Sequence, residues 1–225
     1  MSSTTPTYTI RLFTNPSGTE VAAAEQVLAD AFKGDNFTEM TVGRDPALVL
    51  PFGRSVLTAG LLEGTVYVAE DSTGTIAAVA VWFGPGTEYC HTELQQEKAL
   101  KPLLSQLIPE LQVWWSDQFL GEYNQMISDA LGSEDALLNS WHLQLIGVNP
   151  EHQRRGLAGK IIKLVREKAH AEGYAVTLEP TTEIKRQVYE RMGFATKGHH
   201  VFRAPKDLGE SPMWSMIYSP PSGRT

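Results

Sequence analysis

Hydrophobic and polar residues alternate along parts of this chain and recur at helical spacing along others. Tyr8, Ile10 and Leu12 alternate with polar residues, and Ile76–Phe83 is apolar throughout, as a central strand covered on both faces should be. Strands are predicted at residues 8–12, 66–70, 76–83, 141–148, 176–178, 194–202 and 214–218. Helices are predicted at residues 19–32, 45–62, 156–172 and 182–192. This order predicts a single α/β domain.

The strand at residues 141–148 leads directly to the candidate chemistry. Strict alternation places Trp141, Leu143 and Leu145 on one face of this strand and His142, Gln144 and Ile146 on the other. Residues 87–140 are the least regular part of the chain. They could form helices at 93–104, 106–119 and 123–131, which Pro102, Pro109 and Gly121 interrupt, so we expect a helical insertion packed on the sheet.

Composition narrows the class of protein. With 225 residues and 42% hydrophobic content, the chain can bury a substantial core. Its formal net charge of -7 argues against a nucleic-acid partner, because neutralising phosphates needs a broad basic face. Cys90 is the single cysteine, so the chain can form no internal disulfide, and we expect a cytoplasmic protein. Cys90 has no evident partner base, so we expect it to be unreactive. We expect no metal site, no signal peptide and no membrane span.

A glycine-rich turn between the strand at 141–148 and the helix at 156–172 is the strongest candidate for a binding site. Backbone N–H groups at such a turn converge at the positive end of the helix dipole, which favours a phosphate. The turn and the first helical residues are Gln153, Arg154, Arg155, Gly156, Leu157, Ala158, Gly159 and Lys160. The turn has neither the three-glycine dinucleotide fingerprint nor the Gly-Lys-Ser/Thr of a Walker loop.

Residues 153–158 resemble motif A of the GNAT superfamily of acyl-CoA N-acyltransferases, Gln/Arg-x-x-Gly-x-Gly/Ala. Residues 188–194, Val-Tyr-Glu-Arg-Met-Gly-Phe, resemble motif B of the same family. Residues 66–81 and 141–159 are also similar to the puromycin N-acetyltransferase branch. The resemblance covers residues 8–218 and implies one GNAT-like domain, with a mixed sheet of about six or seven strands, an insertion at 87–140 and flexible termini at 1–7 and 219–225.

The resemblance implies that acetyl-CoA is the cosubstrate. Backbone N–H groups of residues 154–160 would hold its pyrophosphate, and main-chain groups of Ile146, Gly147 and Val148 would follow its pantetheine arm. The strands at 141–148 and 176–178 would splay apart to admit that arm. Where the family often has Asn, this chain has Lys185, which could reach a CoA phosphate or point to solvent.

Acyl transfer from a thioester to an amine needs a base, a stabilised oxyanion and a proton for the leaving thiolate. Tyr189 is our candidate proton donor, because a phenol stays protonated at neutral pH. Glu179, directly after a strand, is our candidate base, and Glu70 and Asp71 are alternatives. Each of these residues could instead be structural. His142 is interpreted as structural, and the pair His199–His200 could mark an acceptor pocket.

These observations favour an acetyl-CoA-dependent N-acetyltransferase that acts on a small-molecule amine in a ternary complex. A non-catalytic acyl-CoA-binding regulatory module is one alternative, although such a sensor needs no proton donor. A protein N-acetyltransferase is another. The acceptor and the oligomeric state do not follow from the sequence, since acceptor pockets vary more freely than the fold.

Overall fold

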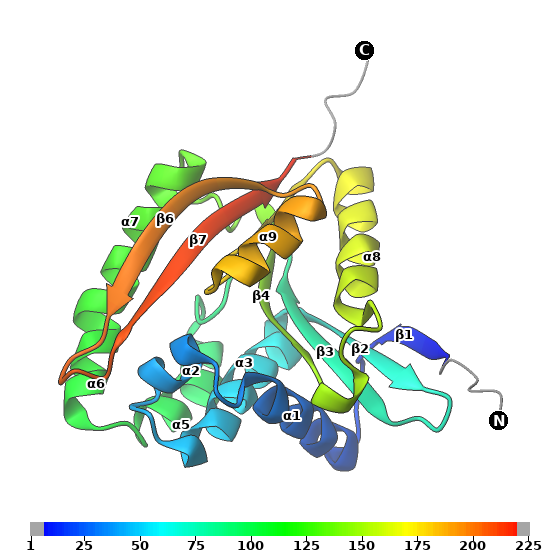
Figure 1. Cartoon of the computed structure of the whole chain (residues 1–225), viewed down its shortest axis with the longest axis horizontal. Coiled ribbons are helices and arrows are strands. Elements are labelled where there is room, and N and C mark those ends of the chain that lie inside the picture. The colour runs from blue at the N-terminus through cyan, green and yellow to red at the C-terminus, as the bar shows by residue number, and fades with distance from the viewer. Residues whose placement is uncertain (1–6, 220–225) are drawn as a thin grey trace.

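The computed structural model describes residues 7–219, and most of each terminal segment that we expected to be flexible lies outside this range. One seven-stranded mixed sheet has the order β1-β2-β3-β4-β5-β7-β6 (Figure 1). Only β4 and β5 pair in parallel. The strands are β1 (Tyr8–Leu12), β2 (Thr65–Asp71), β3 (Ile76–Phe83), β4 (Ser140–Val148), β5 (Ala175–Leu178), β6 (Ala195–Arg203) and β7 (Glu210–Tyr218).

Helices cover both faces of this sheet. The longer ones are α1 (Gly18–Phe32), α3 (Val49–Glu63), α7 (Leu120–Leu131), α8 (Leu157–Glu172) and α9 (Glu183–Arg191); the short ones are α2 (Asn36–Thr41), η1 (Pro46–Leu48) and η4 (Pro150–His152). The fold class, the seven strands and the main helices confirm the prediction from the sequence. The short helix α2 was not predicted.

Three apolar clusters hold these layers together. The first joins α8 to β2, β3, β4 and β5, and the second joins α1 and α3 to the opposite face of β2 and β3. The third lies between α2, the 87–140 segment and the hairpin β6–β7. Every residue of β3 is buried, as its continuous apolar run predicted. The central strand therefore anchors the α8 layer and the α1–α3 layer, which meet at the site described below.

The insertion is helical, but its breaks differ from the prediction. One continuous helical segment comprises α4 (Glu93–Gln95), the π-helix η2 (Gln96–Leu100) and α5 (Lys101–Leu104). Another comprises α6 (Pro109–Val113), the π-helix η3 (Trp114–Phe119) and α7. The expectation that Pro102 and Gly121 interrupt helices was wrong, since both lie inside these segments. Pro102 directly follows the widened turn, in which the Lys101 N–H bonds to the Gln96 carbonyl.

The predicted alternation along β4 was wrong beyond Leu143. Leu143 pairs with Trp82 and Leu145 pairs with Val81, so Gln144 is an extra residue in a β-bulge. The bulge reverses the faces of the residues that follow. Leu145 consequently packs on the α1–α3 side, whereas Ile146 and Val148 join Trp141 and Leu143 on the α8 side.

Close helix packing on the sheet gives a stability prediction. A Cβ atom on Gly60 of α3 would lie 2.4 Å from Val81 Cγ1, whereas one on Gly121 of α7 would meet nothing within 4 Å. We expect Gly60→Ala to lower the free energy of unfolding by about 1–3 kcal/mol through overpacking. Gly121→Ala should raise it by about 0.5–1 kcal/mol, because alanine favours the helix. Urea unfolding of both variants tests this, and equal effects would contradict the packing described.

Candidate functional site

The site begins where two parallel strands stop pairing. β4 pairs with β5 only from Ser140–Ala175 to Leu143–Leu178, and beyond Leu143 the strand β4 keeps β3 as its neighbour. The main-chain edge of β4 from the bulge at Gln144 to Val148 therefore opens into a gap. A split between these two strands is what the family resemblance implied, and Ile146, Gly147 and Val148 lie along it.

A cavity of about 340 Å³ occupies this split. Its lining joins residues that lie far apart in the sequence. β4 contributes Leu143–Ile146, the end of β5 contributes Leu178 and Glu179, and α9 contributes Lys185 and Tyr189. The cavity also reaches Ala158 in the first turn of α8. One space therefore connects the glycine-rich turn to both candidate catalytic residues.

The glycine-rich turn presents an uncapped helix end. Gly156, the residue before α8, has φ +76°, a backbone conformation that L side chains rarely adopt, and no side chain caps the helix. A Cβ on Gly159 would meet nothing within 4 Å, which leaves space beside the first turn. The first N–H groups of this 16-residue helix are thus available to an anion, and the helix dipole favours one there.

Side chains around the turn support the same reading. Arg154, Arg155 and Lys160 are exposed and add positive charge. Arg155 Nη2 donates to the Glu151 carbonyl at 3.1 Å, and Gln153 Nε2 donates to the Val148 carbonyl at 3.2 Å. These two bonds tie the turn to η4 and to the end of β4. The residues present therefore fit the pyrophosphate of a coenzyme A thioester, and the split along residues 144–148 fits its extended arm.

Tyr189 lies on α9 and faces the cavity. Its ring packs edge-on against Phe194, with centroids 5.9 Å apart, and joins the apolar cluster beneath α8. Among the described residues no hydrogen bond contributes to the pKa of its hydroxyl. Burial raises the pKa of Tyr189 to about 12, so the phenol remains protonated at neutral pH. Such a group can donate a proton to a leaving group but cannot act as a base.

Glu179 directly follows β5 and is almost completely buried, with 7% of its side chain exposed. The Tyr123 hydroxyl donates to Glu179 Oε2 at 3.3 Å, whereas Oε1 has no partner among the described residues. Burial raises the pKa of Glu179 to about 8, and the nearby carboxylate of Glu88 contributes in the same direction. A carboxyl group with a pKa near neutrality suits general base catalysis.

A buried chain of hydrogen bonds leads to the side chain of His142, which lies next to Glu179. The Ser140 hydroxyl donates to the Leu137 carbonyl at 3.2 Å and so accepts from the hydroxyl of Thr177, 2.9 Å away. Thr177 Oγ1 can then accept from His142 Nδ1 at 3.2 Å. If Nδ1 carries the proton, His142 Nε2, which faces Glu179 Oε2 at 3.4 Å, presents its lone pair to the carboxyl group.

The ionisation of His142 agrees with that arrangement. Burial lowers the pKa of His142 to about 4, so the ring is neutral above that pH. The neutral ring therefore gives Glu179 no cationic partner. From the sequence we interpreted His142 as structural, and only the structure brings it next to the candidate base.

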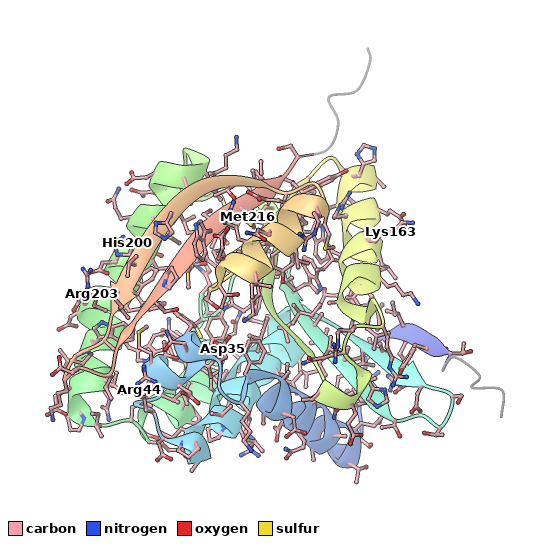
Figure 2. All side chains as sticks on the ribbon, in the orientation of Figure 1. Asp35, Arg44, Lys163, His200, Arg203 and Met216 are labelled. Carbon is pink, nitrogen blue, oxygen red and sulfur yellow. The ribbon has the colours of Figure 1, made fainter. Side chains whose placement is uncertain are left out.

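Lys185 has a partner within the chain. Its Nζ lies 2.7 Å from Asp35 Oδ2 and 5.6 Å from the centre of the Phe32 ring. Asp35 caps α2 and lies where α1 and α2 face α9 (Figure 2). The ion pair therefore joins α9 to the opposite wall of the cavity. A contact between Lys185 and coenzyme A stays a prediction, and it would require the lysine to exchange Asp35 for a phosphate.

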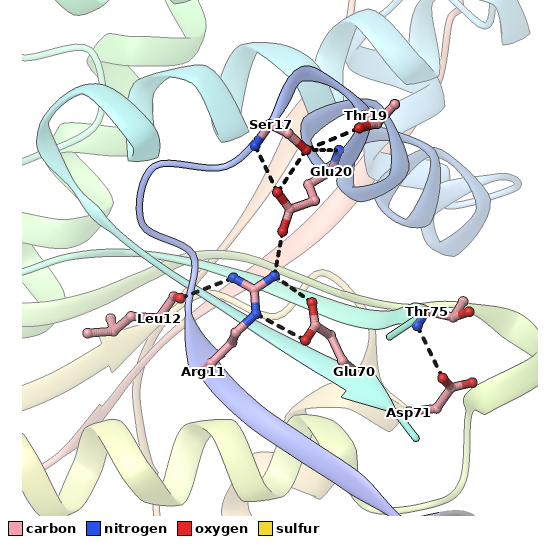
Figure 3. A network of polar contacts seen from close by, with 8 residues as sticks. All are labelled: Arg11, Leu12, Ser17, Thr19, Glu20, Glu70, Asp71 and Thr75. Atoms are coloured by element: carbon pink, nitrogen blue, oxygen red, sulfur yellow. Dashed lines mark hydrogen bonds and ion pairs between the residues drawn. The ribbon is translucent and has the colours of Figure 1, made fainter. Parts of the chain in front are cut away.

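The other two candidate bases, Glu70 and Asp71, are bonded to residues outside the cavity. Arg11 Nε and Nη2 bond to the two carboxylate oxygens of Glu70 at 3.0 and 2.5 Å, and Nη2 also bonds to Glu20 (Figure 3). Asp71 accepts hydrogen bonds from Thr73 and Thr75 in the β2–β3 turn. Neither carboxylate lines the cavity. Glu179 is therefore the stronger candidate.

The remaining polar candidates also lie elsewhere. His199 packs on Trp214, and His200 bonds to Glu122 Oε2 at 3.0 Å outside the cavity. Burial raises the pKa of the Cys90 thiol to about 12, which leaves it unreactive. Within residues 7–219 no group of three or more His, Cys, Asp or Glu side chains is arranged to hold a metal ion.

Comparisons with known proteins agree with this geometry. Residues 120–204 match the family model of the acetyltransferase (GNAT) domain. An uncharacterized N-acetyltransferase of Schizosaccharomyces pombe is 27% identical over 139 residues, which cover 62% of this chain and 54% of that protein. The match thus spans about half the length of this curated relative.

Solved structures share the fold across nearly the whole chain. A protein described as histone acetyltransferase HPA2 and related acetyltransferase, from Corynebacterium glutamicum, superposes with a TM-score of 0.63 at 18% identity, covering 99% of this chain and 100% of that one. Arylalkylamine N-acetyltransferase 2 from Aedes aegypti gives 0.57 at 17% identity, covering 93% and 98%.

The domain match and the fold point to the same class of protein. Residues 120–204 match the GNAT acetyltransferase domain, and the chain shares the fold of solved acetyltransferases over nearly its whole length. The comparisons do not single out the puromycin N-acetyltransferase branch. None of the helices within residues 7–219 combines the length and apolar character of a membrane span.

The raised pKa of Glu179 gives a prediction about stability. The folded protein keeps this proton up to a pH of about 8, whereas the unfolded chain loses it near the ordinary value of 4.5. The wild type should therefore lose stability relative to Glu179→Gln as pH rises between these values, by about 1 kcal/mol for each pH unit. Urea unfolding at pH 5, 6.5, 8 and 9 measures the difference. A constant difference would show that Glu179 is ionised throughout.

Proposed function

We propose that the protein transfers the acetyl group of acetyl-CoA to the amine of a small molecule by direct attack in a ternary complex. The observation that supports this proposal most strongly is the continuity of the cavity. It extends from Ala158 at the glycine-rich turn, along Ile146, to Glu179 and Tyr189. A base and a proton donor thus share one space with the candidate donor site.

The proposed chemistry assigns one role to each group. Acetyl-CoA supplies the acyl group as a thioester. The N–H groups at the start of α8, together with Gln153, Arg154, Arg155 and Lys160, bind the pyrophosphate, and main-chain groups of residues 146–148 align the pantetheine arm. Both substrates are thereby held in one slot, which supplies rate through effective concentration.

Proton transfers complete the reaction. Ionised Glu179 takes a proton from the acceptor ammonium, directly or through one water, and the neutral amine attacks the carbonyl carbon. Main-chain N–H groups near Val148 stabilise the negative charge on the carbonyl oxygen. As the carbon–sulfur bond breaks, Tyr189 donates its proton to the leaving thiolate. The products are the acetylated amine and free coenzyme A.

Two alternatives receive less support. A non-catalytic acyl-CoA sensor has no need of a buried base beside the arm. A protein acetyltransferase would need an acceptor groove open to a polypeptide. We retain this alternative because the similar C. glutamicum protein is described as a histone acetyltransferase. Aromatic side chains of the insertion line the cavity here, which favours a small molecule.

A panel of amines with acetyl-CoA tests the proposed function. The panel should contain alkylamines, arylamines, a polyamine, peptides and, because of the resemblance to the puromycin branch, an aminonucleoside. We expect mass spectrometry to find at least one small amine heavier by one acetyl group, with coenzyme A released in equal amount. Gly156→Val should remove both the signal and the rise in melting temperature caused by acetyl-CoA, while the protein stays folded. Acetyl-CoA binding without turnover would favour the sensor.

Tyr189→Phe tests the proton donor. The variant keeps the ring that packs on Phe194 and loses only the hydroxyl. We expect kcat to fall by about 100-fold or more, because a proton donor typically contributes that much. The dissociation constant of acetyl-CoA, measured by calorimetry, should change little. A variant with near-normal kcat, under conditions where chemistry limits the rate, would leave Tyr189 with a packing role.

A further inference from the structure

Part of the cavity wall is aromatic and is built by the insertion. Trp115, Phe119 and Tyr123 follow one another at four-residue intervals along η3 and α7, and all three line the cavity. The Trp115 and Phe119 ring centroids are 4.7 Å apart, and Phe119 stacks on Tyr123 at 6.1 Å. Phe37 of α2 extends this wall, with its centroid 5.9 Å from that of Phe119.

Hydrogen bonds fix the orientation of these rings. Trp115 Nε1 donates to the Thr41 carbonyl at 3.0 Å, and the Tyr123 hydroxyl donates to Glu179. The polar atoms of Trp115 and Tyr123 are thus bonded within the protein. The wall therefore offers ring faces and edges to a ligand, which an aromatic body matches through stacked or edge-on contacts.

Three carboxyl groups line this cavity. Asp35 is paired with Lys185, whereas Glu179 and Glu88, which follows β3, bond to no lysine or arginine among the described residues. Within residues 7–219 the Glu88 side chain takes part in neither a hydrogen bond nor an ion pair with another side chain. Burial raises the pKa of Glu88; Asp135 adds to this shift and His91 opposes it. An ammonium group would give the Glu88 carboxyl group a direct bonding partner.

We propose that the acceptor is a compact aromatic primary amine, whose ring rests on the Trp115–Phe119–Tyr123 wall and whose ammonium is held by Glu88 while Glu179 takes its proton. This inference rests on the proposed function and specifies its substrate class. A polyamine fits poorly, because each additional charge would have to leave water for an apolar cavity. An aliphatic amine meets the carboxyl groups but gains less from the rings.

Acceptor competition tests the ring contact. With acetyl-CoA saturating, kcat/KM should be at least about tenfold higher for phenethylamine than for n-hexylamine or spermidine, as expected for one aromatic contact in a closed site. Phe119→Leu should reduce the ratio of phenethylamine to n-hexylamine severalfold. Phe202→Leu is the matched control: Phe202 packs against Phe119 at 4.9 Å but does not line the cavity, so the ratio should persist whatever the loss of stability.

The role of Glu88 needs a separate variant. Glu88→Gln should raise KM for phenethylamine about tenfold or more with kcat largely kept, because it removes a charge that holds the ammonium. Glu122→Gln, which alters a carboxylate bonded to His200 outside the cavity, should leave KM unchanged. An unchanged KM for Glu88→Gln would overturn the proposed role of Glu88.

The possible outcomes distinguish a failure of the aromatic-acceptor proposal from a failure of the proposed acetyltransferase function. Preference for spermidine, a peptide or n-hexylamine would overturn the aromatic acceptor while leaving acetyl transfer intact. An equal loss for all acceptors in Phe119→Leu would also overturn the ring contact. If the protein binds acetyl-CoA but acetylates no amine at all, both the proposed function and this inference are wrong.

Discussion

The end of pairing between β4 and β5 is the constraint on which the site depends. A strand that loses a neighbour exposes main-chain groups that must be satisfied by another partner. In this protein the β-bulge at Gln144 bends β4 directly after its last pair with β5, Leu143–Leu178. The freed edge from Gln144 to Val148 ends at the turn before α8. The same geometry that leaves the edge unpaired therefore aims it at an uncapped helix end.

Burial at the base of this split determines the chemistry available there. Glu179 is the first residue after β5, so the parting of the strands places its carboxyl group inside the protein without a cation. The cost of burying a charge keeps that group protonated to a higher pH than usual. Tyr123 and the neutral ring of His142 contact the carboxyl group, and the chain through Thr177 and Ser140 orients the ring. Burial thus determines the ionisation of the candidate base, and the hydrogen-bond chain positions the ring beside it.

The sequence was informative where the signal is local. The apolar run of β3, the glycine turn before α8 and the periodicity of α8 each depend on neighbouring residues, and the structure agrees with all three. The bulge at Gln144 could not be predicted, because an extra residue in one strand is defined only by its partner strand. The pair Lys185–Asp35 joins residues 150 positions apart. Glu88 and the rings of Trp115, Phe119 and Tyr123 likewise line one cavity only in the folded chain.

The pH dependence of kcat/KM for Glu179→Gln tests the central claim most directly. For an alkylamine acceptor, which is protonated at neutral pH, the wild-type profile should rise through an apparent pKa of about 8. The variant should lose this limb, fall by about 100-fold or more at pH 7, and recover partly at high pH, where more of the acceptor is already neutral. An arylamine acceptor, which arrives neutral, should be nearly indifferent to the substitution. Equal losses for both acceptors, or an unchanged limb, would contradict Glu179 as the base.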